Sequence, residues 1–412
     1  MTGQPTPLAA SVIIVSRHRP AALCRCLTGL SQSDHPRFEV IVVADPVGVT
    51  AVRAGGWPVK LATFDEPNIS AARNVGLGLA SAPVVAFIDD DAVPEPTWLS
   101  RLVAPFSDGR VMQAGGFVRG RNGISFQWRA MEVDAAGQDH PLAVAAGVSL
   151  HAGNARRAVK TQGTNCAFRR DDLLAIGGFD PGYRFYLDEA DVNLRLAARG
   201  LTAVVPGAEV HHGFAASARR RADRVPTDLT DIGASIAHFL RRHGDGDPDA
   251  LRCHRAQHRA RLLRLMVEGR IEPRDVRWLM ASLAAGMAEP PPGRALLPLT
   301  PSPLPLLPLP GTGPRPGRVI AGRIWQGATL RARAEAAVAA GEVVTVLNLS
   351  PTARAHYLAF QPGGYWMQRG GLFGRSDRAA PRVQPCGFHA RVDRETRRTA
   401  PQRPVSPGQA VG

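Results

Sequence analysis

Three consecutive aspartates, Asp89, Asp90 and Asp91, directly follow the apolar run at residues 84–88. Carboxylates this close repel one another unless a cation or several hydrogen-bond donors lie nearby. A hard divalent ion meets that need, because Mg²⁺ binds one or two carboxylates and completes its shell with phosphate oxygens and water. Alternation along an extended chain places Asp89 and Asp91 on one side and Asp90 on the other. The motif predicts a site for a metal and a phosphate, with a solvated acidic turn as the alternative.

A second acidic cluster, Asp188, Glu189 and Asp191, opens a predicted helix over residues 188–199. The N-terminal dipole of a helix favours negative charge, so simple capping is the alternative interpretation. Transfer to a hydroxyl acceptor requires one carboxylate site for a metal and a further carboxylate for proton abstraction. The two clusters together therefore predict a group-transfer enzyme, which neither cluster predicts alone.

Apolar runs that alternate with helical patterns surround both clusters. We predict buried strands over residues 11–16, 38–44, 59–63, 84–88, 111–118, 166–169, 201–205 and 209–212. We predict helices over residues 21–30, 69–79, 98–106, 171–176 and 232–242, and loops with short elements over 119–164. Buried runs without polar alternation, separated by helices, indicate a parallel α/β sheet. Ligands of such sheets bind beyond the carboxyl ends of the strands, which is where the aspartates lie.

The chain resembles the family 2 glycosyltransferases with the GT-A fold in five ordered blocks, which are SVIIVSRHRP, FEVIVVAD, NISAARNVGLGLASAPVVAFIDDDAVPEPTWL, GTNCAFRRDDLLAIGGFD and YLDEADVNLRLAARG. The resemblance covers about residues 10–213 and extends to bacterial enzymes of polysaccharide or glycoconjugate synthesis. It implies an α/β fold with a mostly parallel central sheet and helices on both faces. It also implies inverting transfer of a sugar from a nucleotide-diphosphate sugar to a hydroxyl acceptor, assisted by Mg²⁺ or Mn²⁺. A growing glycan or a lipid-linked saccharide is the acceptor that we expect.

The resemblance also implies roles for particular residues of the nucleotide-sugar site. Asp45 matches the acidic position that contacts the base, and Arg73 matches the arginine of the helix under the nucleotide. Asp89 is expected near the ribose, and Asp91 is the principal expected metal ligand, with Asp89 beside it. The full nucleotide-sugar set implied in this way is Val15, Asp45, Arg73, Asp89, Asp90, Thr164 and Asn165.

The catalytic base and the third metal ligand are implied in the same way. Glu189 falls at the position of the base, and Asp188 and Asp191 remain alternatives because many members have Glu-Asp where this chain has Asp-Glu. His211 matches a late histidine that completes metal coordination, with His212 as the alternative. The chain departs from the family at Ala44-Asp45-Pro46, where two acids are frequent, and in the segment that begins at Val15.

The net charge of +15 on this chain of 412 residues is confined to its second half. Residues 1–212 carry 20 basic and 20 acidic side chains, whereas residues 213–412 carry 30 and 15. That division excludes a uniformly basic nucleic-acid coat and favours regions with different roles. Five cysteines without framework spacing fit a reducing compartment. We expect a cytoplasmic protein without a signal peptide or a membrane span.

The chain is expected to divide into a GT-A domain and four further parts. These are residues 1–245 for the GT-A domain, 246–288 for an Arg-rich helical extension, 289–316 for a Pro-rich extended linker, 317–394 for a small α+β unit and 395–412 for a disordered tail. Within the small unit we predict a helix over 329–340, a strand over 343–349 and a hairpin of 357–361 with 365–368. The role of this unit is not assigned by its sequence.

The basic helices allow two interpretations. Their arginines fit peripheral contact with an anionic membrane surface that carries a lipid-linked acceptor. Alternatively, their apolar stripe packs on the catalytic domain and the arginines are simply solvated. An alternative function of a different class is that the whole chain is a noncatalytic protein that binds nucleic acid or another anionic surface. Phe239 and Trp278 are the only aromatic residues between Arg219 and Met287, which disfavours base stacking, and we expect no nucleic-acid partner.

Overall fold

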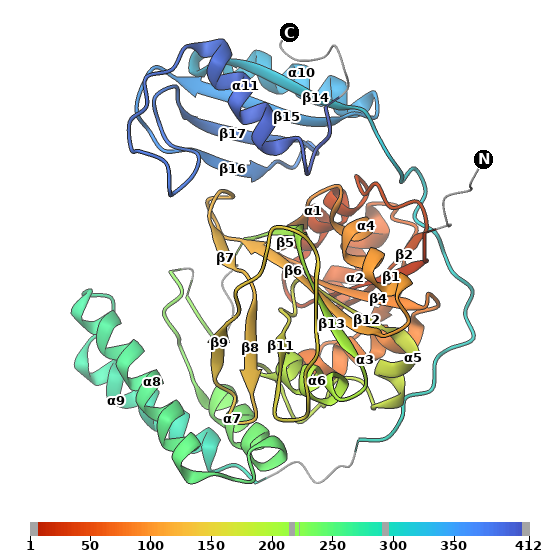
Figure 1. Ribbon diagram of the computed structural model, residues 1–412, viewed down its shortest axis with the longest axis vertical. Helices are drawn as coiled ribbons and strands as arrows, with labels where there is room; N and C mark the ends of the chain where they lie inside the picture. Colours follow the sequence, from red (N-terminus) through yellow and green to blue (C-terminus); the bar gives the residue numbers. More distant parts are fainter. Residues whose placement is uncertain (1–6, 214–218, 222, 291–295, 406–412) are drawn as a thin grey trace.

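The computed structural model describes residues 7–213, 219–221, 223–290 and 296–405 (Figure 1). A large α/β domain occupies most of the first half of the chain, a pair of long helices projects from one end of it, and a smaller α/β unit lies against the other end. An extended segment, residues 296–316, runs along the outside of the large domain towards the smaller unit.

Four parallel strands form one half of the central sheet. They are β1 (Ala10–Ser16), β2 (Phe38–Ala44), β3 (Lys60–Thr63) and β4 (Val84–Asp89), in the order β4-β1-β2-β3. Val15 of β1 pairs with Val43 on one side and with Asp89 on the other. The carboxyl ends of β1, β2 and β4 therefore meet at one edge, and the aspartates that follow β4 lie at that edge.

The other half of the sheet is mixed. It contains β6 (Val111–Arg119), β10 (Ser149–His151), β12 (Cys166–Arg169) and β13 (Leu201–His212), with the short strands β5 (Ala92–Pro94) and β7 (Phe126–Trp128) at its margin. β12 is antiparallel to both β4 and β6, whereas β13 is parallel to β6. The two strands predicted over 201–205 and 209–212 form one strand, interrupted by an irregularity between Val205 and Glu209.

Helices cover both faces of this sheet. They are α1 (Pro20–Leu30), α2 (Pro46–Ala54), α3 (Ile69–Leu79), α4 (Trp98–Val103), the 3-10 helix η1 (Ala104–Ser107), α5 (Arg170–Ala175) and α6 (Asp188–Ala197). Val12 and Ile14 of β1 belong to the core under α1 and α4, whereas Ile13 between them belongs to the core under α3 and α6. This is the GT-A arrangement that the sequence predicted. Helix α2, which begins at Pro46, was not predicted.

A three-stranded sheet lies within the segment predicted as loops and short elements. Its strands are β8 (Met131–Asp134), β9 (Asp139–Pro141) and β11 (Arg157–Lys160), in the order β11-β8-β9. The buried side chains of Val133 and Ala158 attach this sheet to α6. The sheet thereby brings Lys160 close to the start of α6, where the second acidic cluster lies.

The basic helices pack against the large domain. α7 (Thr230–His243), α8 (Pro248–Val267) and α9 (Pro273–Met287) share one core with α6, to which Leu194, Phe239, Leu262 and Leu283 contribute. Gly233 and Gly286 allow α7 and α9 to approach closely, because a Cβ at either glycine would clash with backbone of the other helix. The apolar stripe is thus a packing surface. Of the described residues, no helix combines the length and the apolar character that crossing a bilayer requires.

The Pro-rich segment is extended, as predicted, but it is fastened to the large domain. Backbone hydrogen bonds join Leu299 to Leu174, Ser302 to Gly78 and Leu309 to Phe38. The side chain of Leu309 is buried in the core under α1. Prolines prevent this segment from forming a helix, but its remaining N–H groups still bind the domain surface. Residues 291–295 of the predicted linker lie outside the described residues.

The smaller unit is an α/β sheet with a helix on each face. It consists of β14 (Gly317–Arg323), the 3-10 helix η2 (Ile324–Gln326), α10 (Gly327–Ala339), β15 (Val343–Ser350), β16 (Tyr357–Phe360), β17 (Trp366–Gly371) and α11 (Phe388–Thr399). β14, β15 and β17 are parallel, and β16 forms a hairpin with β17. The structure confirms the predicted helix, strand and hairpin.

The prediction of a disordered tail from residue 395 is wrong as far as residue 405. Glu395 lies within α11, and its buried carboxylate accepts hydrogen bonds from Gln368 and Ser376. Farther along, Arg403 is almost fully buried and pairs with Glu95 of the large domain at 2.9 Å. The charge-rich composition of this segment does not predict a fold, because Glu395 and Arg403 bind partners from other parts of the chain. Residues 406–412 lie outside the described residues.

Candidate active site and metal centre

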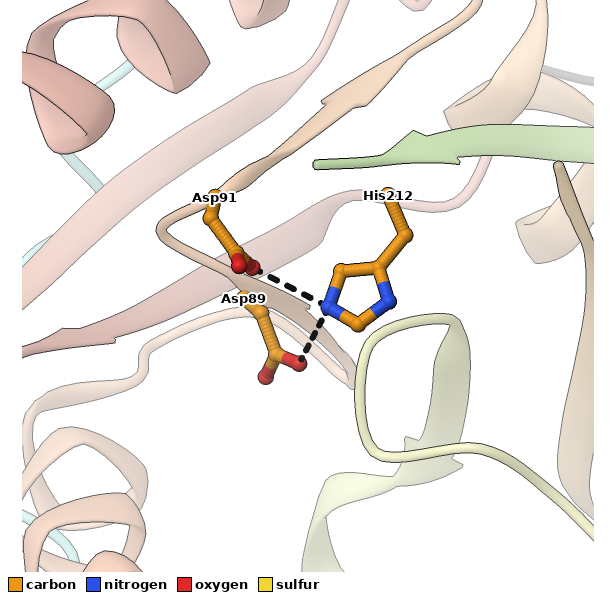
Figure 2. Close-up of side chains that lie close together, drawn as sticks. All are labelled: Asp89, Asp91 and His212. Atoms are coloured by element: carbon orange, nitrogen blue, oxygen red, sulfur yellow. Dashed lines mark ion pairs between the residues drawn. The ribbon is translucent and has the colours of Figure 1, made fainter. Parts of the chain in front are cut away.

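Asp89, Asp91 and His212 form a compact cluster at the edge of the central sheet (Figure 2). One ligand atom from each residue lies within 4.8 Å of the others. His212 Nε2 is 3.1 Å from Asp91 Oδ1 and 3.8 Å from Asp89 Oδ2. The pairing of His212 with Ala92 across β13 and β5 brings the histidine to the aspartates. Two carboxylates and one imidazole suit a divalent ion such as Mn²⁺ or Mg²⁺, with positions left for phosphate oxygens.

His211, which the sequence assigned to the metal, lies elsewhere. Its Nε2 is 2.8 Å from Glu95 Oε1, and its ring packs against Trp366 with the centroids 4.6 Å apart. Neighbouring side chains on a strand point to opposite faces, so His211 and His212 of β13 cannot both reach the cluster. The structure therefore corrects the assignment to His212, the alternative.

Asp90 is not part of the cluster of Asp89, Asp91 and His212, and it is completely buried. It accepts a hydrogen bond of 2.7 Å from Ser16 Oγ and lies 3.0 Å from Arg19 Nη2. Burial raises the pKa of this carboxyl to about 7, although Arg19 acts in the opposite direction. Asp90 was expected to contact the nucleotide sugar, but its position makes it an anchor that fixes the aspartate turn to β1 and the start of α1.

Arg73 of α3 connects the two acidic clusters that the sequence shows as separate. Its Nη1 donates to Asp188 Oδ2, and its Nη2 lies 3.7 Å from Asp89 Oδ1. The guanidinium also lies over the ring of Phe179, 5.1 Å from its centroid. Burial tends to lower the pKa of Arg73, but the Asp188 and Asp89 carboxylates outweigh it and the pKa is raised. Arg73 therefore carries a fixed positive charge beside the metal cluster.

Glu189 lies next to this ion pair and faces a cavity. The cavity has a volume of about 170 Å³, and Arg73, Asp89, Thr164, Asp188 and His212 also line it. Burial and the neighbouring Asp188 raise the pKa of Glu189 to about 8, against the opposing influence of Lys160 and Arg73. A carboxyl group with a pKa near the working pH is suited to act as a general base. Its environment thus separates Glu189 from the other acids of α6.

Asp191 is not available for catalysis. Its carboxylate is fully buried, 2.6 Å from Arg195 Nη2, 3.0 Å from Arg242 Nε and 2.8 Å from His243 Nε2. Burial alone would raise its pKa, but Arg195 and the other partners lower it to about 2. Asp191 therefore holds α6 to α7, and it drops out of the catalytic set. Asp188 in turn is held by Arg73.

A second cavity of about 230 Å³ adjoins the first, and Ile69, Asp89, Phe185 and His212 line both. Val15, which is expected to contact the nucleotide sugar, lines this second cavity. So do five arginines that the sequence analysis did not assign to the site: Arg17, Arg19, Arg184, Arg219 and Arg220. The sequence feature that could have identified Arg17 and Arg19 is their position just after the first predicted strand. For Arg219 and Arg220 the only such feature is a run of basic residues, which lies far from the first strand in the sequence. The metal cluster thus lies between a basic chamber and the chamber of Glu189.

Of the remaining predicted residues, one lines the chamber of Glu189 and two are buried outside both chambers. Thr164 lines the Glu189 chamber. Asn165 does not: it is completely buried, donates to Phe117 O and Ala208 O, and accepts from Trp98 Nε1 at 2.8 Å. Its predicted contact with the donor sugar is therefore replaced by a structural role. Asp45 is buried below His18, whose backbone N–H it accepts at 3.2 Å, and it lines neither chamber.

The fold and site together define a GT-A domain with a cluster of two aspartates and a histidine that could hold a divalent metal ion. Residues 11–173 match the family described as glycosyl transferase family 2, and this part of the chain belongs to that family. The segment ends before α6 and β13, so Glu189 and His212 lie beyond it.

Two curated relatives are similar to parts of the chain. O-antigen biosynthesis protein RfbC of Myxococcus xanthus is 29% identical over 266 residues, which cover 58% of this chain and 20% of that protein. Glucosyl-dolichyl phosphate glucuronosyltransferase of Haloferax volcanii is 30% identical over 112 residues, covering 27% of this chain and 34% of that protein. The matched regions thus span about a fifth and a third of the lengths of these relatives.

Solved structures with low identity are also similar. Mannosyltransferase PcManGT from Pyrobaculum calidifontis, in complex with GDP-Man and Mn²⁺, is 18% identical with a TM-score of 0.42, and the match covers 68% of this chain and 86% of that one. S. aureus TarS 1-349 in complex with UDP is 15% identical with a TM-score of 0.39, and the match covers 57% and 64% of the two chains.

Proposed function

We propose that this protein is an inverting glycosyltransferase that moves a sugar from a nucleotide-diphosphate sugar to a hydroxyl acceptor in a single displacement. The observation that carries the proposal is the position of the Asp89, Asp91 and His212 cluster between a basic chamber and the chamber of Glu189. Membership of residues 11–173 in glycosyl transferase family 2 supports it.

The basic chamber is the proposed site of the nucleotide diphosphate. Arg17 and Arg19 lie at the carboxyl end of β1, and Arg219 and Arg220 line the same cavity from a distant part of the chain. Asp89, Asp91 and His212 would hold Mg²⁺ or Mn²⁺, which supplies positive charge to the leaving diphosphate. Arg73 adds a fixed charge close by, and such pre-positioned charges stabilise the negative charge that develops during transfer.

The chamber of Glu189 is the proposed site of the transferred sugar and of the acceptor. Glu189 accepts the proton of the acceptor hydroxyl while that oxygen forms a bond to the anomeric carbon. The bond from that carbon to the diphosphate breaks on the opposite side, and the diphosphate departs with the electron pair. Attack opposite to the leaving group inverts the configuration at this carbon. Arg73 pairs with Asp188 and orients it, which leaves Glu189 to exchange the proton.

We propose a growing glycan or a lipid-linked saccharide as the acceptor. The names of the two curated relatives, one of O-antigen biosynthesis and one a glucuronosyltransferase that acts on a glucosyl-dolichyl phosphate, favour this class. Contact with an anionic membrane stays a prediction.

A screen of donors tests the proposed function. The full chain is mixed with UDP-, GDP- and dTDP-sugars, with Mn²⁺ or with EDTA, and thermal shift and nucleotide release are measured. We expect at least one donor to raise the melting temperature in the presence of Mn²⁺ and to release its nucleoside diphosphate when a saccharide acceptor is added. If every donor leaves both readouts unchanged, the proposed function is wrong.

A further inference from the structure

The smaller unit contains a cavity of about 400 Å³ at the carboxyl edge of its parallel strands. Asn348 and Ser350 come from the end of β15, Arg369 and Gly370 from the end of β17, and Gly327 begins α10 above them. Sheets built from parallel strands and crossover helices bind their ligands at this edge. The unit therefore repeats, on a small scale, the geometry that places the active site in the large domain.

Asn348 is the first indication that something binds here. Its side chain is only 7% exposed, and its Oδ1 has no hydrogen-bond partner among the described residues. Leaving a buried amide oxygen unpaired is unfavourable, because the oxygen gives up its hydrogen bonds to water without replacement. Val344 and Val346 on the same face of β15 pack against α10, but the next position along that face is Asn348, opposite Gly327. The structure thus places a polar group where an apolar one would continue the core.

Three arginines provide the second, independent indication. Arg331, Arg354 and Arg369 all line the cavity and all are exposed. Among the residues that the structure describes, no carboxylate lies within ion-pair distance of any of the three. The 13-residue helix α10 starts at the same cavity without a side-chain cap, so its positive end adds to their charge. Guanidinium groups and a helix N-terminus together form a strong attraction for phosphate or carboxylate.

We propose that this cavity binds a saccharide that bears a phosphate or carboxylate group. The anionic group is held by Arg331, Arg354, Arg369 and the N-terminus of α10, and a sugar hydroxyl donates to Asn348 Oδ1. Tyr357 lines this cavity and also a second one of about 340 Å³, which reaches Asp91 and His212. One extended anionic glycan can therefore follow the surface from the smaller unit towards the metal cluster. The site itself does not depend on the proposed function.

Calorimetric titration of the full chain with glucose 6-phosphate, glucuronate, inorganic phosphate and glucose tests the site. Every titration uses the Asp91→Asn variant as the parent protein, in which the proposed metal site is disabled. Any binding that is measured is therefore independent of sugar transfer. We expect binding of at least one of the two anionic sugars, weaker binding of inorganic phosphate, and no measurable binding of glucose. The double substitution Arg331→Ala with Arg369→Ala should weaken binding by at least tenfold.

Two further variants separate the cavity from general charge effects. Arg333→Ala removes a charge from the same helix outside the cavity and should leave affinity within about twofold. Asn348→Asp retains the shape but adds a negative charge, and it should reduce affinity for the anionic sugars by at least tenfold. Equal affinities in the Asp91→Asn parent protein, in the variant that adds Arg331→Ala and Arg369→Ala, and in the variant that adds Asn348→Asp would overturn the proposal. The absence of binding of both anionic sugars at millimolar concentration would overturn it as well.

Discussion

Arg73 and Asp188 form a buried ion pair that joins the two acidic clusters of this chain into one site. The partners are 115 residues apart in sequence and come from α3 and α6. The same guanidinium lies 3.7 Å from Asp89, so the metal cluster and the acids of α6 share one cation. This relationship supports the proposal that Glu189 is the carboxyl group that exchanges a proton.

Removal of Arg73 should destabilise the protein strongly. Arg73→Ala leaves the buried carboxylate of Asp188 without its partner, and breaking a buried pair in this way costs about 3–5 kcal/mol. Chemical denaturation of the full chain measures the loss. Arg110→Ala, which removes an exposed partner of Asp108, serves as the control and should cost much less, because exposed ion pairs contribute little to stability. Similar losses of unfolding free energy for the two variants would show that the ion pair of Arg73 and Asp188 does not stabilise the fold.

Glu189→Gln should abolish sugar transfer but preserve nucleotide binding. The amide cannot accept the proton of the acceptor hydroxyl, and the loss of a general base lowers kcat by about 10²- to 10⁴-fold. The nucleotide diphosphate is proposed to bind in the basic chamber, so the Kd for the nucleotide should change by less than about threefold. Turnover is measured with the donor that the screen identifies, and Asp172→Asn on α5 is the control. Near-normal turnover in Glu189→Gln would reassign the base.

The pH dependence of activity should reflect the same carboxyl group. Burial and Asp188 raise the pKa of Glu189 from 4.5 to about 8, so its basic form is scarce in acid and accumulates as the pH rises. We expect kcat/KM to increase with pH up to about 8 and then to level off. A profile that is flat between pH 6 and pH 9 contradicts this assignment.

The stability of the folded protein should decrease as the pH rises, whereas kcat/KM increases. A carboxyl whose folded pKa is raised contributes stability while it is protonated, and this contribution is lost as the pH rises from 4.5 towards about 8. Glu189→Gln remains neutral throughout, so its melting temperature should equal that of the wild type near pH 4.5 and exceed it near pH 8. Melting curves of both proteins at the two pH values provide the measurement, and an unchanged difference would exclude a raised pKa.

His212 and His211 should differ in their effect on metal binding. His212→Ala removes one of three ligands and should weaken Mn²⁺-dependent binding of nucleotide by at least about tenfold. His211→Ala should leave that binding within about twofold, because His211 faces Glu95 and Trp366. Titration calorimetry with UDP or GDP, with and without Mn²⁺, compares the two variants. The reverse order of effects would restore His211 as the ligand.

Arg403 should be required for stability although it lies near the end of the chain. Arg403→Ala leaves Glu95 without its bidentate partner in a fully buried position and should cost about 3–5 kcal/mol. Arg397→Ala, on the last turn of α11, is a matched control that should cost less than about 1 kcal/mol. A loss for Arg403→Ala as small as that of the control would mean that the segment after α11 is not part of the folded unit.

The sequence alone determined the parts of this protein that depend on local pattern. Apolar runs of strand length predict β1, β2 and β4, because a strand buried on both faces needs no polar alternation. The aspartate triplet predicts a metal site, because adjacent carboxylates need a cation. The resemblance to family 2 glycosyltransferases places Glu189 and Arg73 near that site.

The tertiary structure alone decided which of several chemically equivalent residues perform each role. His211 and His212 are neighbours in sequence, and only the pairing of β13 with β5 selects His212. Asp191 and Glu189 open the same helix, but Arg242 and His243 of α7 neutralise one of them. The lack of a hydrogen-bond partner for Asn348 Oδ1 and the pairing of Arg403 with Glu95 likewise depend on residues that are distant in sequence. Local periodicity encodes which face of an element is buried, whereas the charge state of a residue depends on partners that only the folded chain brings within a few ångströms.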